Sequence, residues 1–218
     1  MATRLILIRH GETLANVEMV YQGQGDSPLS SLGLAEAKEL AAALKPENFA
    51  GIYCSTLLRS RQTAELIAEP HKLTVTSFPE LKERYYGVFE GLKFTEIRDG
   101  YPEAYDAWLH HPDQAKIPQA ETLEELQARG VKKIEEILAE HKGKTVCVVG
   151  HGGLNRTILF HYMNLGLDNF WRIRQDNCCV NIIELAVPAG RQDHHPIVTL
   201  LNSTWFLGEK RVSKMGIY

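Results

Sequence analysis

Two histidines each follow an apolar segment and each precede a glycine. His10 comes after apolar residues 5–8 and Arg9, and His151 comes shortly after apolar residues 145–149. An apolar run that ends at a glycine is typical of a buried strand followed by a turn, and open α/β sheets bind ligands at the carboxyl ends of their strands. The pattern therefore predicts that the two histidines share one site. Arg9 indicates an anionic ligand, because a guanidinium group offers donors that match phosphate or carboxylate oxygens.

These residue types suit the hydrolysis of phosphomonoesters without a metal ion. That reaction needs a nucleophile, positive charge around the phosphoryl oxygens, and an acid for the leaving alkoxide. A neutral ring nitrogen of His10 can attack phosphorus if the other nitrogen donates to a backbone carbonyl and fixes the tautomer. Arg9, Arg59 and a protonated His151 are expected to surround the phosphoryl group and to balance its charge.

Neutral donors and a proton carrier complete the expected site. The side-chain amide of Asn16 and the backbone N–H of Gly152, close to a helix N-terminus, can donate to phosphoryl oxygens. Glu83 is the candidate acid and base, since a carboxyl group can donate to the leaving group and then accept a proton from water. From the residues alone, a surface ion pair of Glu83 with Lys82 or Arg84 is the competing interpretation.

Strand-like and helix-like segments alternate along the chain. Strands are expected at residues 4–8, 51–55, 73–78, 145–149, 179–187 and 197–201. Helices are expected from a cap at Ser30 or Ser31 to Leu44, over residues 57–68, 104–109 and 153–163, and from a capping box at Thr122 towards Gly143. This order predicts a three-layer α/β/α fold with a mostly parallel central sheet.

Length and composition place limits on the class of protein. A chain of 218 residues suits one domain, expected over residues 1–218, and residues 92–119 look like an insertion over the sheet edge that serves as a lid. The net charge of −3 provides no global attraction for nucleic acid or an anionic membrane. No apolar run is long enough to span a membrane, so a cytoplasmic protein is expected. The four cysteines lie in or beside apolar runs and are expected to be buried thiols.

Several motifs in this order resemble the histidine phosphatase superfamily, which includes the cofactor-dependent phosphoglycerate mutases. The blocks that carry the resemblance are residues 9–13 with Asn16, Gln22 with Gly23, residues 28–30 with Gly33, residues 55–64, residues 81–83 with Gly87, residues 90–91, and residues 150–153. The resemblance implies a phosphoglycerate mutase-like fold, catalytic roles for Arg9, His10, Arg59, Glu83 and His151, and phosphate or substrate contacts for Asn16, Gln22, Gly23 and Gly152.

Within that family the chain resembles small-metabolite phosphatases such as the α-ribazole phosphatases and phosphoserine phosphatases. A phosphoglycerate mutase is the alternative, favoured by the sequence of residues 83–87. A mutase must also hold a second phosphate, and Lys93, Arg98 and Lys116 are few basic side chains for that purpose in residues 92–119. A phosphate-sensing module without catalysis is a third possibility, although the chain keeps both nucleophile and acid.

Other chemistries and partners fit less well. The spacing from Cys54 to Arg59 leaves four intervening residues, whereas cysteine phosphatases have five. The paired histidines at 110–111 and 194–195 lack the helical spacing of a zinc site, so neither a metal ion nor another cofactor is expected. The expected partner is a small phosphorylated metabolite. The apolar residues 197–201 could also pair at a sheet edge to form a homodimer.

Overall fold

Six strands form one sheet in the computed structural model, which describes residues 2–185 and 196–208. The strands are β1 (Thr3–Arg9), β2 (Phe49–Ser55), β3 (Val75–Phe78), β4 (Thr145–Gly150), β5 (Val180–Leu185) and β6 (Ile197–Ser203). Their order in the sheet is β3-β2-β4-β1-β5-β6. The first four of these strands are mutually parallel, whereas β5 runs antiparallel to β1 and to β6. The predicted mostly parallel sheet is therefore confirmed.

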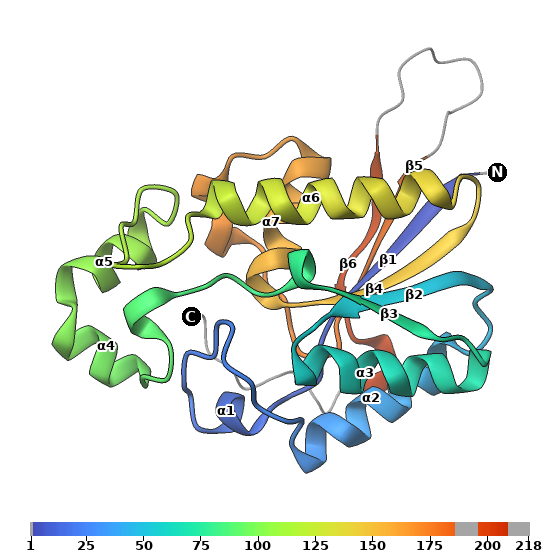
Figure 1. Cartoon of the computed structure of the whole chain (residues 1–218), viewed down its shortest axis with the longest axis horizontal. Coiled ribbons are helices and arrows are strands. Elements are labelled where there is room, and N and C mark those ends of the chain that lie inside the picture. The colour runs from blue at the N-terminus through green and yellow to red at the C-terminus, as the bar shows by residue number, and fades with distance from the viewer. Residues whose placement is uncertain (1, 186–195, 209–218) are drawn as a thin grey trace.

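Helices cover both faces of this sheet. Figure 1 shows α6 (Leu123–Glu140) and α7 (Gly152–Met163) on one side of the strands, and α2 (Ser31–Leu44) and α3 (Leu58–Ala68) on the other. The side chains of β1 alternate between the two layers, because successive residues of a strand point to opposite faces. Leu5 and Leu7 join the core under α6 and α7, while Ile6 and Ile8 join the core under α2 and α3.

The longer helices begin where side-chain caps are available. The Ser30 hydroxyl accepts a hydrogen bond from the Gly33 backbone N–H, so Ser30, one of the two predicted residues, caps α2. Thr122 and Glu125 form the predicted capping box of α6. This helix ends at Glu140, three residues before the expected limit at Gly143, because the last turn gives way to a loop that leads into β4.

The segment of residues 92–119 contains two helices, of which only the second was expected. They are α4 (Phe94–Gly100) and α5 (Pro102–His110), and they lie beyond the carboxyl ends of the strands rather than over the sheet edge (Figure 1). The reason is Trp108, which is fully buried and donates from its indole nitrogen to the Tyr21 hydroxyl at 2.8 Å. Trp108 thus anchors the segment to the core, and a lid motion stays a prediction.

Short helices complete the connections. They are α1 (Leu14–Val17) and the 3₁₀ turns η1 (Glu69–His71), η2 (Pro79–Leu81), η3 (Gly87–Phe89), η4 (Leu167–Arg172) and η5 (Trp205–Leu207). β2 and β3 differ from expectation by two residues at their starts, and β5 begins one residue late. The expected end of β5 at residue 187 and the histidines at 194–195 lie outside the described residues.

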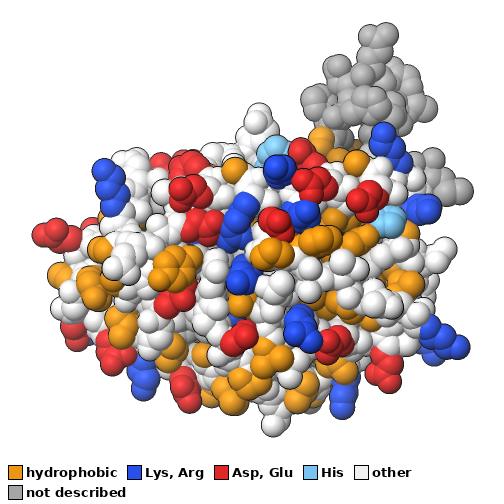
Figure 2. All heavy atoms as spheres, in the orientation of Figure 1, with side chains coloured by type: hydrophobic (Ala, Val, Ile, Leu, Met, Phe, Trp, Pro, Cys, Tyr) orange, Lys and Arg blue, Asp and Glu red, His pale blue; other side chains and the backbone are white. Residues whose placement is uncertain are grey.

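The surface and the cysteines agree with the composition. All four cysteines are buried free thiols, as predicted, and burial raises the pKa of Cys54 to about 12. Acidic and basic side chains are interspersed on the face shown in Figure 2, so this face has no extended patch of one sign. Within the described residues, no helix combines the length and apolar character needed to cross a bilayer. Binding of an anion must therefore depend on local positive charge.

Candidate functional site

The two strand-end histidines lie together at the carboxyl edge of the sheet. β1 and β4 are neighbouring parallel strands in which Arg9 is paired with Gly150, so His10 and His151 follow at the same level. Their ring centroids are 5.1 Å apart and both side chains are buried. The two rings therefore converge, and the site that the sequence pattern predicts them to share stays a prediction.

The environment of His10 favours a neutral ring with one available nitrogen. Its Nδ1 lies 2.7 Å from the Gly11 carbonyl oxygen, which can only accept, so Nδ1 carries the proton. The lone pair of Nε2 then faces the site, where Arg59 Nε donates to it at 3.2 Å. Burial, followed by the charges of Arg59 and Arg9, lowers the pKa of His10 well below its ordinary value of 6.5. The arrangement has the tautomer that a nucleophile requires.

Arg59 is a buried cation held in the first turn of α3. Its Nη2 donates to the Gly23 carbonyl at 2.6 Å and its Nη1 to the Gly25 carbonyl at 2.8 Å. Gly23 has a φ of +49°, a conformation that favours glycine, and a Cβ there would collide with the Glu90 carboxylate. Burial lowers the pKa of Arg59 to about 10, so the guanidinium remains charged at neutral pH. The loop at Gly23 thus fixes a cation beside His10.

His151 has a hydrogen-bond partner that the sequence analysis missed. Its Nε2 lies 2.7 Å from the hydroxyl of Ser55, which ends β2, the other neighbour of β4. Burial, then the charges of Arg59 and His10, lowers the pKa of His151 well below 6.5. The protein groups alone thus favour the neutral ring, and a His151 protonated around a bound phosphoryl group stays a prediction. Ser55 could have been found as the third residue at a parallel strand end.

Glu83 points into the site instead of forming the surface ion pair considered above. Its Oε2 accepts from Gly153 N at 2.9 Å, and its Oε1 accepts from Leu154 N at 3.0 Å and Arg84 N at 2.8 Å. A Cβ at Gly153 would come within 2.6 Å of Oε1, so glycine permits this close approach. The N-terminal donors of α7 are thus directed at Glu83, while Gly152 borders the cavity beside Arg9.

These side chains surround a cavity of about 280 Å³. The predicted residues that line it are Arg9, His10, Asn16, Gln22, Gly23, Arg59, Glu83 and Gly152. His151, which was also predicted, contacts the His10 ring but does not itself line the cavity. Two buried polar atoms of the lining residues, Arg9 Nε and Gln22 Oε1, have no hydrogen-bond partner within the described residues, and neither has His151 Nδ1 behind them. Buried polar atoms are normally paired. Their convergence here indicates a polar ligand with both donors and acceptors.

Asn16 combines a structural contact with a position at the cavity. Its Oδ1 accepts from Thr13 N at 3.1 Å, which completes the capping box of α1, and from Asn177 Nδ2 at 3.4 Å. With the amide oxygen occupied in this way, the amide Nδ2 is the group that can donate to a ligand. Arg9 is positioned similarly, since its Nη1 donates to the Gln175 carbonyl at 2.6 Å.

A second group of arginines on the cavity wall was missed by the sequence analysis. Arg156, Arg172 and Arg174 line the cavity, and all three lie outside residues 92–119, where extra basic residues were expected if a second phosphate is bound. Arg156 donates through Nε to the Ile173 carbonyl at 2.7 Å, and its guanidinium lies 5.1 Å from the Trp171 ring centre. Its place in the second turn of α7, just after His151, was the available signal.

Arg156 has no carboxylate within ion-pair distance among the described residues, although Arg174 is paired with Asp176 at 2.7 Å. Burial, followed by the charge of Arg9, lowers the pKa of Arg156 to about 10. Arg156 is partly buried, and removing a guanidinium from water without a counter-ion is unfavourable. The part of the cavity that Arg156 lines is therefore suited to a negatively charged group of the ligand.

Comparison with known proteins agrees with this geometry. Residues 5–194 match the family model of the histidine phosphatase superfamily, branch 1. The chain is 34% identical to the metal-independent phosphoserine phosphatase of Arabidopsis thaliana over 94% of this chain and 86% of that protein. It is 29% identical to the adenosylcobalamin/alpha-ribazole phosphatase of Escherichia coli strain K12, over 84% of this chain and 90% of that protein.

A solved structure shows the same architecture. YhfR of Bacillus stearothermophilus superposes with a TM-score of 0.85 at 32% identity, and the match covers 93% of this chain and 99% of that one. The order of the motifs, the paired histidines and the fold thus agree with the family match. This chain belongs to branch 1 of the histidine phosphatase superfamily.

Proposed function

We propose that this protein, as one domain of residues 1–218, hydrolyses phosphomonoesters of small metabolites through a phosphohistidine at His10 and without a metal ion. The observation that carries the proposal is the pair of buried histidine rings 5.1 Å apart, with two arginines beside them at a polar cavity. Because His10 is held in the tautomer with Nε2 unprotonated, the site has its nucleophile ready.

In the first step, the Nε2 lone pair of His10 attacks phosphorus and the bond from phosphorus to the ester oxygen breaks. Arg9 and Arg59 stabilise the negative charge on the phosphoryl oxygens, and the Asn16 amide and Gly152 N–H add neutral donors. A phosphoryl dianion also brings a negative charge next to His151, which favours protonation of that ring when substrate is bound. A protonated Glu83 gives its proton to the leaving alkoxide.

In the second step, water attacks the phosphohistidine. Glu83 is now ionised and accepts a proton from that water, the bond from phosphorus to Nε2 breaks, and inorganic phosphate is released. The contacts from Gly153 and Leu154 support a carboxylate in this position, and they are compatible with a proton on Glu83 because a carboxyl oxygen that carries hydrogen can still accept. Dividing the transfer into two steps is what nucleophilic catalysis provides.

We further propose that the leaving group of the substrate carries a carboxylate or another anionic group. The support is Arg156, a partly buried cation with no carboxylate within ion-pair distance among the described residues, and Arg172, which also lines the cavity. Gln22 Oε1 offers an acceptor for a hydroxyl or amino group of the substrate. Phosphoserine, named in the Arabidopsis relative, has a carboxylate and an amino group and fits this description.

The direct test is phosphate release in the presence of a chelator. We expect turnover of para-nitrophenyl phosphate, and faster turnover of phosphoserine than of phosphoethanolamine, which lacks the carboxylate. Arg156→Met should reduce that preference while leaving para-nitrophenyl phosphate hydrolysis largely intact. Equal rates for phosphoserine and phosphoethanolamine would contradict the charged leaving group, and loss of all activity with chelator would contradict the metal-independent mechanism.

The same assay separates the two alternatives. A mutase would transfer phosphate between the positions of phosphoglycerate and would depend on added bisphosphoglycerate. A phosphate-sensing module would bind phosphate but show no turnover at any pH. Arg156, Arg172 and Arg174 on the cavity wall add to the few basic side chains of residues 92–119. The second phosphate of a mutase substrate would also find basic groups there.

Glu83→Gln is expected to spare phosphoenzyme formation from esters with good leaving groups and to slow it with poor ones, by roughly 10² to 10⁴-fold. A stable phenolate leaves without a proton, whereas an unstable alkoxide needs the acid. The measurement is the rate with 2,4-dinitrophenyl phosphate and with phenyl phosphate. Glu136→Gln, on the exposed face of α6, is the control and should change neither rate. Equal slowing of both esters would count against Glu83 as the acid.

Two further parts of the proposal concern the environment and the assembly. We propose a cytoplasmic enzyme, which four buried free thiols support.

A homodimer is supported by β6, the last strand of the sheet, where Ile197 and Leu201 are about half exposed. Sedimentation analysis of the purified protein tests the dimer.

A further inference from the structure

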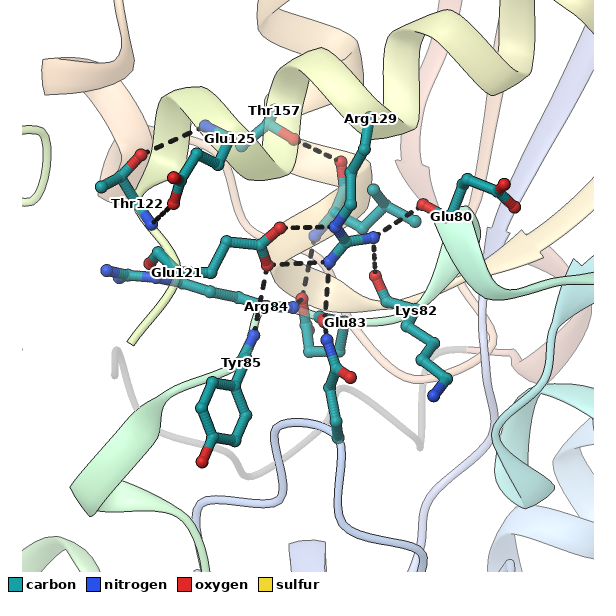
Figure 3. Close-up of polar contacts among 12 residues, drawn as sticks. Glu80, Lys82, Glu83, Arg84, Tyr85, Glu121, Thr122, Glu125, Arg129 and Thr157 are labelled. Carbon is teal, nitrogen blue, oxygen red and sulfur yellow. Dashed lines mark hydrogen bonds and ion pairs between the residues drawn. The ribbon is translucent and has the colours of Figure 1, made fainter. Parts of the chain in front are cut away.

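Glu83 lies in an irregular loop, so its position depends on contacts from elsewhere. The loop between η2 and η3 is not part of a helix or strand. Two of its backbone carbonyls and one of η2 accept from one side chain: Arg129 Nη1 donates to Glu80 O in η2 at 2.6 Å and to Lys82 O at 2.7 Å, and Nη2 donates to Glu83 O at 2.9 Å. Figure 3 shows this guanidinium group above the loop. Arg129 therefore holds the backbone at Glu80, at Lys82 and at Glu83 itself.

The remaining donors of Arg129 bind Glu121. Arg129 Nε donates to Glu121 Oε1 at 2.5 Å and Nη2 donates to Oε2 at 2.9 Å, in the bidentate geometry that a guanidinium makes with a carboxylate. A guanidinium has five N–H donors, and the five acceptors use all of them. The side chains of Arg129 and Glu121 are only 21% and 13% exposed. A lysine has three donors and no planar fork, so it could not reproduce these contacts.

Glu121 extends the same contacts to the residues after Glu83. Its Oε2 accepts from Tyr85 N at 3.3 Å, and its carbonyl accepts from Arg84 Nε at 2.7 Å (Figure 3). Glu121 immediately precedes Thr122, the N-cap of α6, and Arg129 lies about two turns along that helix. Hydrogen bonds from the Arg129–Glu121 pair thus connect residues 80–85 to the first two turns of α6, a helix with a capping box.

We infer that the Arg129–Glu121 pair is a positioning device for the proton transfer by Glu83. Neither residue lines the cavity, so neither touches the substrate. The pair fixes the main chain at Glu83, while Gly153 and Leu154 of α7 fix its carboxylate from the other side. Proton transfer requires the carboxyl within hydrogen-bond reach of the leaving oxygen, and a shift of about 1 Å can cost roughly 10²-fold in rate. This inference rests on the proposed function of Glu83.

The test compares Arg129→Met with wild type on 2,4-dinitrophenyl phosphate and phenyl phosphate. We expect kcat/KM to fall by roughly tenfold to 10²-fold for phenyl phosphate and by about threefold or less for the dinitrophenyl ester, because only the poorer leaving group needs the acid. Arg129→Lys should lie between wild type and Arg129→Met. In a Glu83→Gln background, Arg129→Met should add little, since both changes remove the same proton transfer.

Arg4→Met is the matched control. Arg4 forms an ion pair with Glu47 at 2.6 Å, with both side chains 28% exposed, at the opposite end of β1 from His10. Its loss should lower the melting temperature without changing the ratio of the two rates. The same result for Arg129→Met, equal slowing of both esters with only a lower melting temperature, would overturn the inference.

The inference can be tested even if one of the variants does not fold. If Arg129→Met does not fold, Arg129→Lys and Glu121→Gln give the same comparison of the two esters. The two sets of variants also distinguish the acid role of Glu83 from the positioning role of the Arg129–Glu121 pair. A Glu83→Gln variant that slows both esters equally would overturn the acid role and the inference with it. Selectivity in Glu83→Gln but not in the Arg129 and Glu121 variants would overturn the positioning role alone.

Discussion

His10→Ala should abolish turnover of every phosphomonoester and prevent labelling of the protein by radioactive phosphate from substrate. Alanine removes the Nε2 atom that forms the covalent bond, and the other buried histidine, His151, does not line the cavity. The Nε2 of His151 is engaged by Ser55 at 2.7 Å. Losses on removing a covalent nucleophile are about 10⁴-fold or more. The measurements are phosphate release and the acid-labile, base-stable label of a phosphohistidine after rapid quench.

The control for this variant is His110→Ala. His110 lies on α5 with its side chain 65% exposed, and it does not line the cavity. Both turnover and labelling should therefore match wild type. A His10→Ala protein that keeps more than about one hundredth of the wild-type rate would contradict the covalent mechanism. Labelling of His10→Ala at another residue would assign the nucleophile elsewhere.

Arg59→Ala should lower kcat/KM by roughly 10² to 10⁴-fold, or about 3 to 5 kcal/mol of transition-state stabilisation. Arg59 is 1% exposed and contacts the nucleophile directly, since its Nε donates to His10 Nε2 at 3.2 Å. A charge-assisted contact to a phosphoryl oxygen in such a buried place is strong. The loss should appear with good and poor leaving groups alike, because Arg59 stabilises the phosphoryl charge and not the leaving oxygen.

Arg61→Ala provides the comparison on the same helix. Arg61 is two residues further along α3, its side chain is 51% exposed, and it pairs with Glu65 at 3.6 Å. A surface pair of this kind contributes about 0 to 1 kcal/mol, so activity should be unchanged. A loss below about tenfold for Arg59→Ala would make that residue peripheral to catalysis. Melting temperatures of both variants would show whether the lost contacts to Gly23 and Gly25 unfold the loop.

Features that depend on neighbouring residues could be predicted from the sequence. The apolar runs before His10 and His151 predicted two strands with ligand-binding ends, and the caps at Ser30 and Thr122 predicted where helices begin. Strand pairing then brought the histidines together, because parallel strands share their carboxyl edge. The short helix α4 and the exact strand ends were less predictable, since propensity at element boundaries is weak and tertiary contacts such as those of Trp108 decide.

The contacts between distant segments were decided only by the tertiary structure. The sequence marked Glu83 as the candidate acid through family resemblance, but its bonds to the start of α7 depend on a loop and a helix that are 70 residues apart meeting in space. Ser55 against His151, Arg156 on the cavity wall, and Arg129 against the carbonyls of Lys82 and Glu83 have the same origin. Local periodicity and capping act over a few residues, whereas a buried hydrogen bond depends on which side chains the whole fold brings within 3 Å.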